Sequence, residues 1–295
     1  MKKTYIIRKF GILCFAVIFL SLGYFINGYR AVFIWKINSY LNYFRKSERN
    51  CIKEIKDIPK NSMLIIGHAY GTPIKSISRG DKGISPKLSK FFKINQTNID
   101  EIVFSGDLLH NPSLKKWDSL FSELDKFKIY VVPGNHDVGL GKYTAKRDIF
   151  KIATQNYSIN NEFPYFFEKN NSLFILDDSN LEKDNLEKIK EILSNNYEFP
   201  KIFIIRHHVL TQSMSKFSNG IPLHPLLKEK SLIEEMDEFK DKNILFIYGD
   251  GGDSRKLSLY CKEKENIKQI INGIGENKRD KILIFSENNL YFKSL

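Results

Sequence analysis

The stretch "KIYVVPGNHD" (residues 128–137) joins an apolar strand pattern to an asparagine, a histidine and an aspartate that follow at once. Upstream, "EIVFSG" (101–106) predicts a second strand, and Asp107 comes directly after it. Apolar residues recur at helical spacing between the two strands. A strand, a helix and a strand of this length form a crossover, so the two strands should be parallel and open on one edge of a sheet.

The same alternation of short apolar runs and amphipathic stretches continues from about residue 61 to residue 295 and predicts an α/β domain. Further strands are expected at 64–67, 172–178, 201–208, 243–252, 257–261, 267–273, 281–286 and 290–295, and helices at 114–127, 182–195 and 230–240. Polar residues follow the strand ends repeatedly, namely His68, Tyr70, Asp107, Asn135, His136, Asp137, His207, His208 and Asp250. Because ligands bind outside the carboxyl ends of strands in open α/β sheets, we expect these side chains to converge.

The composition sets wide limits on function. The chain has 295 residues, 42% of them hydrophobic, and a formal net charge of +12. This charge favours anionic partners such as phosphorylated substrates, acidic lipids or nucleic acid, although an AT-rich coding sequence would also enrich lysine. The cysteines at positions 14, 51 and 261 are too far apart to predict a zinc site or a disulfide framework.

The amino-terminal segment has a membrane-like pattern. No charged residue occurs from Phe10 to Tyr29, and about 20 apolar residues suffice for a helix to cross a bilayer. We expect a single-pass anchor over residues 1–30, a juxtamembrane linker over 31–60 and the catalytic domain over 61–295. Basic residues flank the segment on both sides, so an extracytoplasmic domain is only slightly favoured. The alternative is a secretory signal peptide cleaved after Gly23.

Taken in order, the motifs "SGDLLHNP", "PGNHD", "RHHVL" and "YGDGGD" resemble those of the calcineurin-like metallophosphoesterase family, over roughly residues 61–295. The resemblance implies a two-sheet β-sandwich flanked by helices in four layers. It also implies that Asp107 bridges two metals, that Asn135 and His207 are metal ligands, and that His136 is catalytic.

The implied chemistry is phosphoester hydrolysis with two divalent ions, which could be manganese, iron or zinc. A hydroxide held between the ions would attack phosphorus. His136 would act as general acid toward the leaving oxygen, and Asp137 would hold its ring.

Two motifs depart from the family pattern. "GHAYG" places His68 where the family has an aspartate and Tyr70 where it has a histidine. "GDGG" places Asp250 where the family's last motif has its first histidine, and Gly252 where that motif has its second. We therefore interpret His68 and Asp250 as metal ligands that have exchanged residue types. The exchange preserves the number of carboxylates but loses two imidazoles, so one metal is expected to be weakly held.

Several other residues have two interpretations each. Tyr70, Asp253, His110 or water could supply the missing donors, and Tyr70 and His110 could instead contact substrate or have only structural roles. His208 is expected to lie behind the ligands, Asp177 and Asp178 to be solvated turn carboxylates, and His224 to be structural.

The predicted function is a membrane-anchored, metal-dependent phosphohydrolase that acts on a phosphorylated small-molecule, lipid-linked or glycan substrate of the cell envelope. Nucleic acid is a poor fit, because no aromatic-interleaved basic groove is visible in the sequence. The alternative is a catalytically impaired envelope assembly or scaffold protein that retains the fold. The intact "GNHD" motif favours the enzyme, and the altered first and last motifs favour the scaffold.

Overall fold

A computed structural model describes residues 52–80, 83–139, 144–157, 162–181, 185–209, 234–251, 259–264, 266–276, 278 and 280–295. All of them belong to one compact unit. Among these residues, no helix is both long enough and apolar enough to span a membrane. The predicted anchor, Gly252, Asp253 and His224 lie outside the described residues.

The first sheet carries the strands that begin the site. Its order is β1 (Lys53–Glu54), β12 (Asn289–Ser294), β11 (Lys281–Ser286), β2 (Ser62–Ile66), β3 (Ile99–Ser105) and β4 (Lys128–Val132). β2, β3 and β4 are mutually parallel, with Ile65 opposite Val103 and Val103 opposite Tyr130. The parallel pairing predicted for the strands at 101–106 and 128–134 is thus confirmed.

The second sheet supplies the remaining strand ends. Its order is β5 (Tyr165–Lys169), β6 (Ser172–Leu176), β7 (Lys201–Arg206), β8 (Asn243–Tyr248), β10 (Ile267–Asn272) and β9 (Leu259–Lys264). β6, β7, β8 and β10 are parallel, whereas the edge strands β5 and β9 run antiparallel to their neighbours. The central strands have almost continuous apolar sequences because both of their faces are buried.

An aromatic core joins the two sheets. Phe174 of the second sheet stacks between Phe167 and Phe203, with ring centroids 5.0 and 4.5 Å away. Phe285 of the first sheet meets Phe174 and Phe203 edge-on, at 5.0 and 5.3 Å. Since large aromatic side chains dominate the energetics of a core, these contacts hold the sandwich together.

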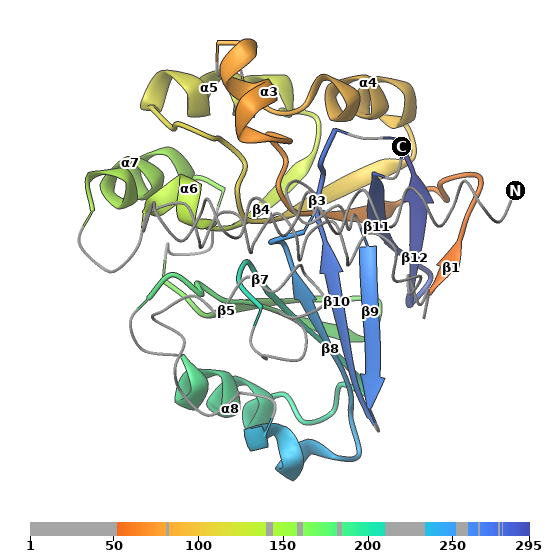
Figure 1. Cartoon of the computed structure of the whole chain (residues 1–295). Helices are drawn as coiled ribbons and strands as arrows, with labels where there is room; N and C mark the ends of the chain where they lie inside the picture. The colour runs from red at the N-terminus through yellow and green to blue at the C-terminus, as the bar shows by residue number, and fades with distance from the viewer. Residues whose placement is uncertain are drawn as a thin grey trace, which may run out of the picture. The chain divides into compact units, whose positions relative to one another are not determined.

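Helices cover the outer faces of both sheets, as Figure 1 shows. The helices that follow strands of the first sheet are α3 (Pro73–Ser78), α4 (Pro86–Asn95), α5 (Leu114–Glu123), α6 (Asn135–Val138) and α7 (Ala145–Thr154). The outer face of the first sheet packs mainly against α4, α5 and α7. The second sheet is covered by α8 (Leu186–Asn195) and the 3₁₀ helix η1 (Glu234–Phe239). The predicted mixed α/β fold of two sheets with flanking helices is therefore confirmed.

Two helix predictions need correction. The segment expected as a helix at 230–240 is described from residue 234 onward, where it is the short 3₁₀ helix η1. The helix expected over 114–127 ends at Glu123, and Leu114 at its start is 41% exposed rather than in the core. Ser113 caps this helix by accepting a hydrogen bond from the Lys116 amide, so Leu114 falls in the open first turn.

Candidate metal centre

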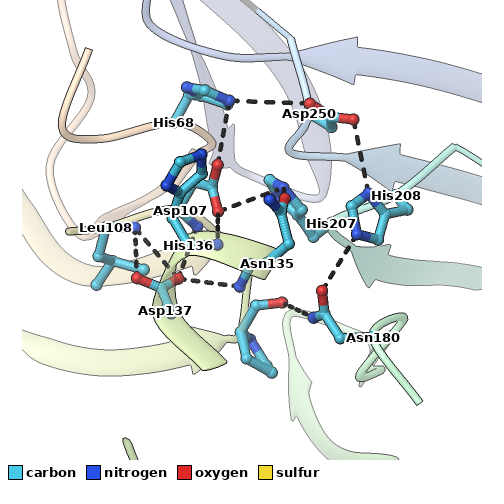
Figure 2. Close-up of polar contacts among 12 residues, drawn as sticks. His68, Asp107, Leu108, Asn135, His136, Asp137, Asn180, His207, His208 and Asp250 are labelled. Atoms are coloured by element: carbon cyan, nitrogen blue, oxygen red, sulfur yellow. Dashed lines mark hydrogen bonds and ion pairs between the residues drawn. The ribbon is translucent and has the colours of Figure 1, made fainter. Parts of the chain in front are cut away.

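The polar residues that follow the parallel strands gather at one edge of the sandwich (Figure 2). They extend from β2 (His68), β3 (Asp107), β4 (Asn135 and His136), β7 (His207 and His208) and β8 (Asp250). Hydrogen bonds tie the two sheets together at this edge: the Gly67 amide donates to Asn272 Oδ1 at 3.2 Å, and the Gly67 carbonyl accepts from the Ile274 amide at 3.0 Å. The site therefore spans the joint between the sheets.

The turns after β2 and β3 hold their polar residues in an unusual backbone conformation. His68 and Asp107 have φ values of 53° and 58°, in the left-handed region that histidine and aspartate tolerate better than most residues. Such positions persist where the surrounding structure fixes them, and they cluster at functional sites. The loop after β4 approaches so closely that a Cβ at Gly134 would lie 2.1 Å from Asp107 Oδ1.

Asp137 fixes the Asp107 turn. Its buried carboxylate accepts hydrogen bonds from the amides of Asp107 (2.7 Å), Leu108 (3.0 Å), Leu109 (3.1 Å) and Gly134 (2.9 Å). Burial and the neighbouring Asp107 carboxylate raise the pKa of Asp137 to about 7, although the hydrogen bonds from the backbone amides act to lower it. The prediction that Asp137 holds the ring of His136 is wrong, because its carboxylate is engaged by the backbone instead.

The ring of His207 is oriented by a carbonyl. Its Nδ1 lies 3.2 Å from the Ser105 carbonyl oxygen, which can only accept, so Nδ1 carries the proton. The Nε2 lone pair then faces Asn135 Oδ1 at 3.1 Å and Asp107 Oδ1 at 3.5 Å. Burial lowers the pKa of His207 to about 4, so this ring is neutral at pH 7. Three acceptor atoms thus converge without a proton among them.

His68 repeats this arrangement on the other side of Asp107. Its Nδ1 lies 3.2 Å from the Gly71 carbonyl oxygen and must donate to it. Its Nε2 then faces Asp107 Oδ2 at 3.2 Å and Asp250 Oδ1 at 3.8 Å. The two oxygens of Asp107 therefore face different imidazoles.

These distances fit ligands that share a cation. Two donors each about 2.1 Å from one ion, at 90–110° to each other, lie roughly 3.0–3.4 Å apart. Buried lone pairs that face one another are unfavourable unless a cation lies between them. Although burial alone would raise the pKa of Asp107, the positive charge that the rings of His207, His68 and His136 carry when protonated holds it below its usual value. The donor set of neutral imidazole, amide oxygen and carboxylate suits divalent ions.

Asp250 lies where the reciprocal exchange would require it. It faces His68 through Oδ1, and its Oδ2 lies 3.6 Å from Nδ1 of His208. His68 and Asp250 come from different sheets, yet their side chains point toward each other (Figure 2).

His136 and two aromatic side chains lie beside this cluster of polar residues. Nδ1 of His136 lies 3.2 Å from the His110 carbonyl oxygen, and its backbone amide donates to Asp107 Oδ1 at 3.0 Å. Tyr70 is fully buried, with its ring 4.9 Å from His68, 5.4 Å from His110 and 5.3 Å from His136. Tyr70 and His110 thus belong to the site region, next to the cluster of polar residues.

The residues after β6 depart from prediction. Asp177 and Asp178 were expected to be solvated, but both are buried. Asp178 pairs with Arg147 of α7, and Asp177 lies 3.2 Å from Arg206 of β7. Their positive partners come from remote parts of the chain, which explains why the local sequence pattern was misleading.

The same loop contains a residue that the sequence analysis missed. Asn180 is buried, and its side chain contacts Asp178, the Pro133 carbonyl and His208. The only local signal was its position, four residues after the end of β6 on the presumed active edge.

Comparison with solved structures finds distant likenesses. Phosphopantetheinyl hydrolase from Mycobacterium tuberculosis is 10% identical with a TM-score of 0.39, over 74% of this chain and 92% of that one. TT1561 of Thermus thermophilus is 11% identical with a TM-score of 0.41, over 80% and 99%. A predicted phosphoesterase from Streptococcus pneumoniae is 10% identical with a TM-score of 0.31, over 77% and 83%. These likenesses are too remote to support a functional argument.

Sequence comparison is more decisive. No curated protein matches the chain. The profile described as calcineurin-like phosphoesterase matches residues 68–233, more than half of the chain, beginning at the histidine that follows β2 and including the Asp107, "GNHD" and "HH" motifs. The chain therefore belongs to the calcineurin-like phosphoesterase family and is a hydrolase that acts on phosphoester bonds.

Proposed function

We propose that this protein hydrolyses a phosphate ester of the cell envelope, on a lipid-linked, glycan or small-molecule substrate, with two divalent ions held between the sheets. The observation that carries the proposal is the convergence of the ring nitrogens of His68, His207 and His208 on the oxygens of Asp107 and Asp250. Members of the family typically bind divalent metals.

The ligands divide into two groups around Asp107. One group is Asp107 Oδ1 with Asn135 and His207, and the other is Asp107 Oδ2 with His68 and Asp250. Divalent ions bound there would supply Lewis acidity to activate water and to offset the negative charge of the phosphate.

His136 is the proposed general acid. Because its Nδ1 donates to the His110 carbonyl, Nε2 is the ring atom that can exchange a proton with substrate. The amide contact to Asp107 ties the position of His136 to the proposed ligands, where Nε2 would face the leaving oxygen of a bound substrate. Tyr70 packs against this ring and restricts its rotation.

The envelope assignment rests on the sequence. An uncharged segment of twenty residues precedes the domain, and the net charge of +12 suits anionic substrates at a membrane surface. We place the catalytic domain on the extracytoplasmic side.

Metal analysis and turnover of an aryl phosphodiester in manganese test the proposal in the full chain, with Asp107→Asn and His136→Ala as variants. Wild type should bind metal and turn over, Asp107→Asn should lose both, and His136→Ala should keep metal while losing at least 100-fold in kcat. A metal-free, inactive wild type would contradict the proposal and favour a scaffold protein that retains the fold.

A further inference from the structure

His208 contacts the ligand cluster directly. Its ring is buried, and its Nδ1 lies 3.6 Å from Asp250 Oδ2. Donor atoms of His207, His208 and Asp250 all lie within 4.8 Å of one another, a grouping that could hold a metal ion. The position that sequence analysis assigned behind the ligands is therefore beside them.

Asn180 determines which nitrogen His208 presents to Asp250. The Asn180 Nδ2 donates to two groups that can only accept, the Pro133 carbonyl at 2.8 Å and Asp178 Oδ1 at 2.9 Å. Its Oδ1 is thereby directed at His208 Nε2, 3.1 Å away. Because an amide oxygen can only accept, His208 carries a proton on Nε2, and Nδ1 is the ring nitrogen that faces Asp250 (Figure 2).

The surroundings hold Asn180 in this orientation. Asp178 accepts from both the amide and the side chain of Asn180 through Oδ1, while its Oδ2 pairs with Arg147. The His208 backbone amide is fixed in turn by Ser179 Oγ at 2.9 Å. Arg147, Asp178 and Asn180 thus form a buried polar chain that ends on the His208 ring.

This arrangement compensates for a missing donor. The last motif has Gly252 where the family has a second histidine, so the ion beside Asp250 lacks an imidazole from that loop. We infer that His208 ligates this ion through Nδ1 together with Asp250, and that Asn180 is the positioning residue that fixes its tautomer. The inference rests on the proposed metal-dependent function and adds to it a ligand supplied from the end of β7.

The test uses the full chain, titrated with Mn²⁺ by calorimetry and loaded with Co²⁺ for proton NMR. His208→Gln should lower the affinity for one ion at least tenfold. It should also remove one paramagnetically shifted, exchangeable ring N–H resonance, because each ligated imidazole contributes one. Asn180→Leu should weaken the same ion about 10- to 100-fold, as loss of a hydrogen bond to a ligating histidine does.

Asn196→Leu is the matched control. Asn196 is also buried and donates its side-chain amide to a carbonyl, that of Ile192, but it precedes β7 whereas His208 follows it. This variant should leave both affinities and the resonance count unchanged. Thermal unfolding in EDTA checks that each variant is folded.

Two results would overturn the inference. If His208→Gln keeps both affinities and all resonances while Asp107→Asn loses metal, His208 is no ligand and the proposed function stands. If wild type binds no divalent ion, the inference and the proposed function both fail. Should His208→Gln not fold, a Co²⁺ spectrum of wild type without an Nε2–H resonance for His208 contradicts the inference.

Discussion

Replacing Arg147 by methionine should destabilise the protein by about 3–5 kcal/mol, because it leaves a buried carboxylate without its cation. Arg147 is 6% exposed and Asp178 is 2% exposed, so little water can replace the lost partner. Asp178 Oδ1 keeps two hydrogen bonds from Asn180, which limits the loss, whereas Oδ2 loses its ion pair. Methionine fills part of the space of the arginine stem, so we expect a value near the lower end of the range.

Urea unfolding in EDTA measures this effect apart from metal binding. With a slope of roughly 3 kcal/mol per molar for a domain of this size, the midpoint should fall by about 1 M. The double variant Arg147→Met with Asp178→Asn should recover part of the loss, because it removes the unpaired charge and keeps an acceptor for Asn180. Lys188→Met, at an exposed site on α8, should shift stability by less than about 0.5 kcal/mol. A loss below about 1 kcal/mol for Arg147→Met, or a double variant no better than the single, would refute the reasoning.

Three further changes test other parts of the account. His68→Asp combined with Asp250→His should bind Mn²⁺ at least about tenfold more tightly than either single variant, since the two side chains lie 3.8 Å apart. Calorimetry measures these Mn²⁺ affinities, and additive losses of affinity would count against an exchange. Gly249→Ala should cost about 3 kcal/mol or more in thermal unfolding, because its Cβ would lie 1.6 Å from a backbone oxygen of β3, and a neutral effect would contradict the close approach of the sheets. Phe174→Ala should lower stability to urea by about 3–5 kcal/mol, because its fully buried ring stacks between two others at the sheet interface, and a loss below about 1 kcal/mol would mean that the interface is loosely packed.

The strand ends were predictable because their signals are local. Each of three apolar runs is followed by a polar residue, namely Asp107, Asn135 or His207. This pattern predicts both the strand and the residue at its carboxyl end. Parallel pairing of β3 and β4 followed from the crossover between them. The sequence alone therefore predicts that these residues converge.

The orientations of the side chains were not predictable in the same way. Asp137 directs its carboxylate to the amides of Asp107, Leu108 and Leu109, and Asp178 is buried against Arg147, because of contacts between segments about 30 residues apart. No periodicity in the sequence encodes such pairs. The tautomer of His208 likewise depends on Asn180, which lies 28 residues away in the chain.

The short edge strand β5 was also missed. Its sequence "YFFEK" alternates buried and exposed residues, but it follows a proline and is only five residues long. Its place in the sheet comes from pairing with β6, with Phe167 opposite Phe174. Such a strand depends on its neighbour more than on its own pattern.

The central claim is that the imidazoles of His68 and His207 and the oxygens of Asp107 converge on divalent cations. Crystals grown with Mn²⁺ and measured for anomalous scattering test it most directly. The account predicts a peak about 2.2 Å from Asp107 Oδ1 and from His207 Nε2, with a second, weaker peak beside His68 and Asp250. No anomalous peak within ligand distance of Asp107 at millimolar Mn²⁺ would contradict it.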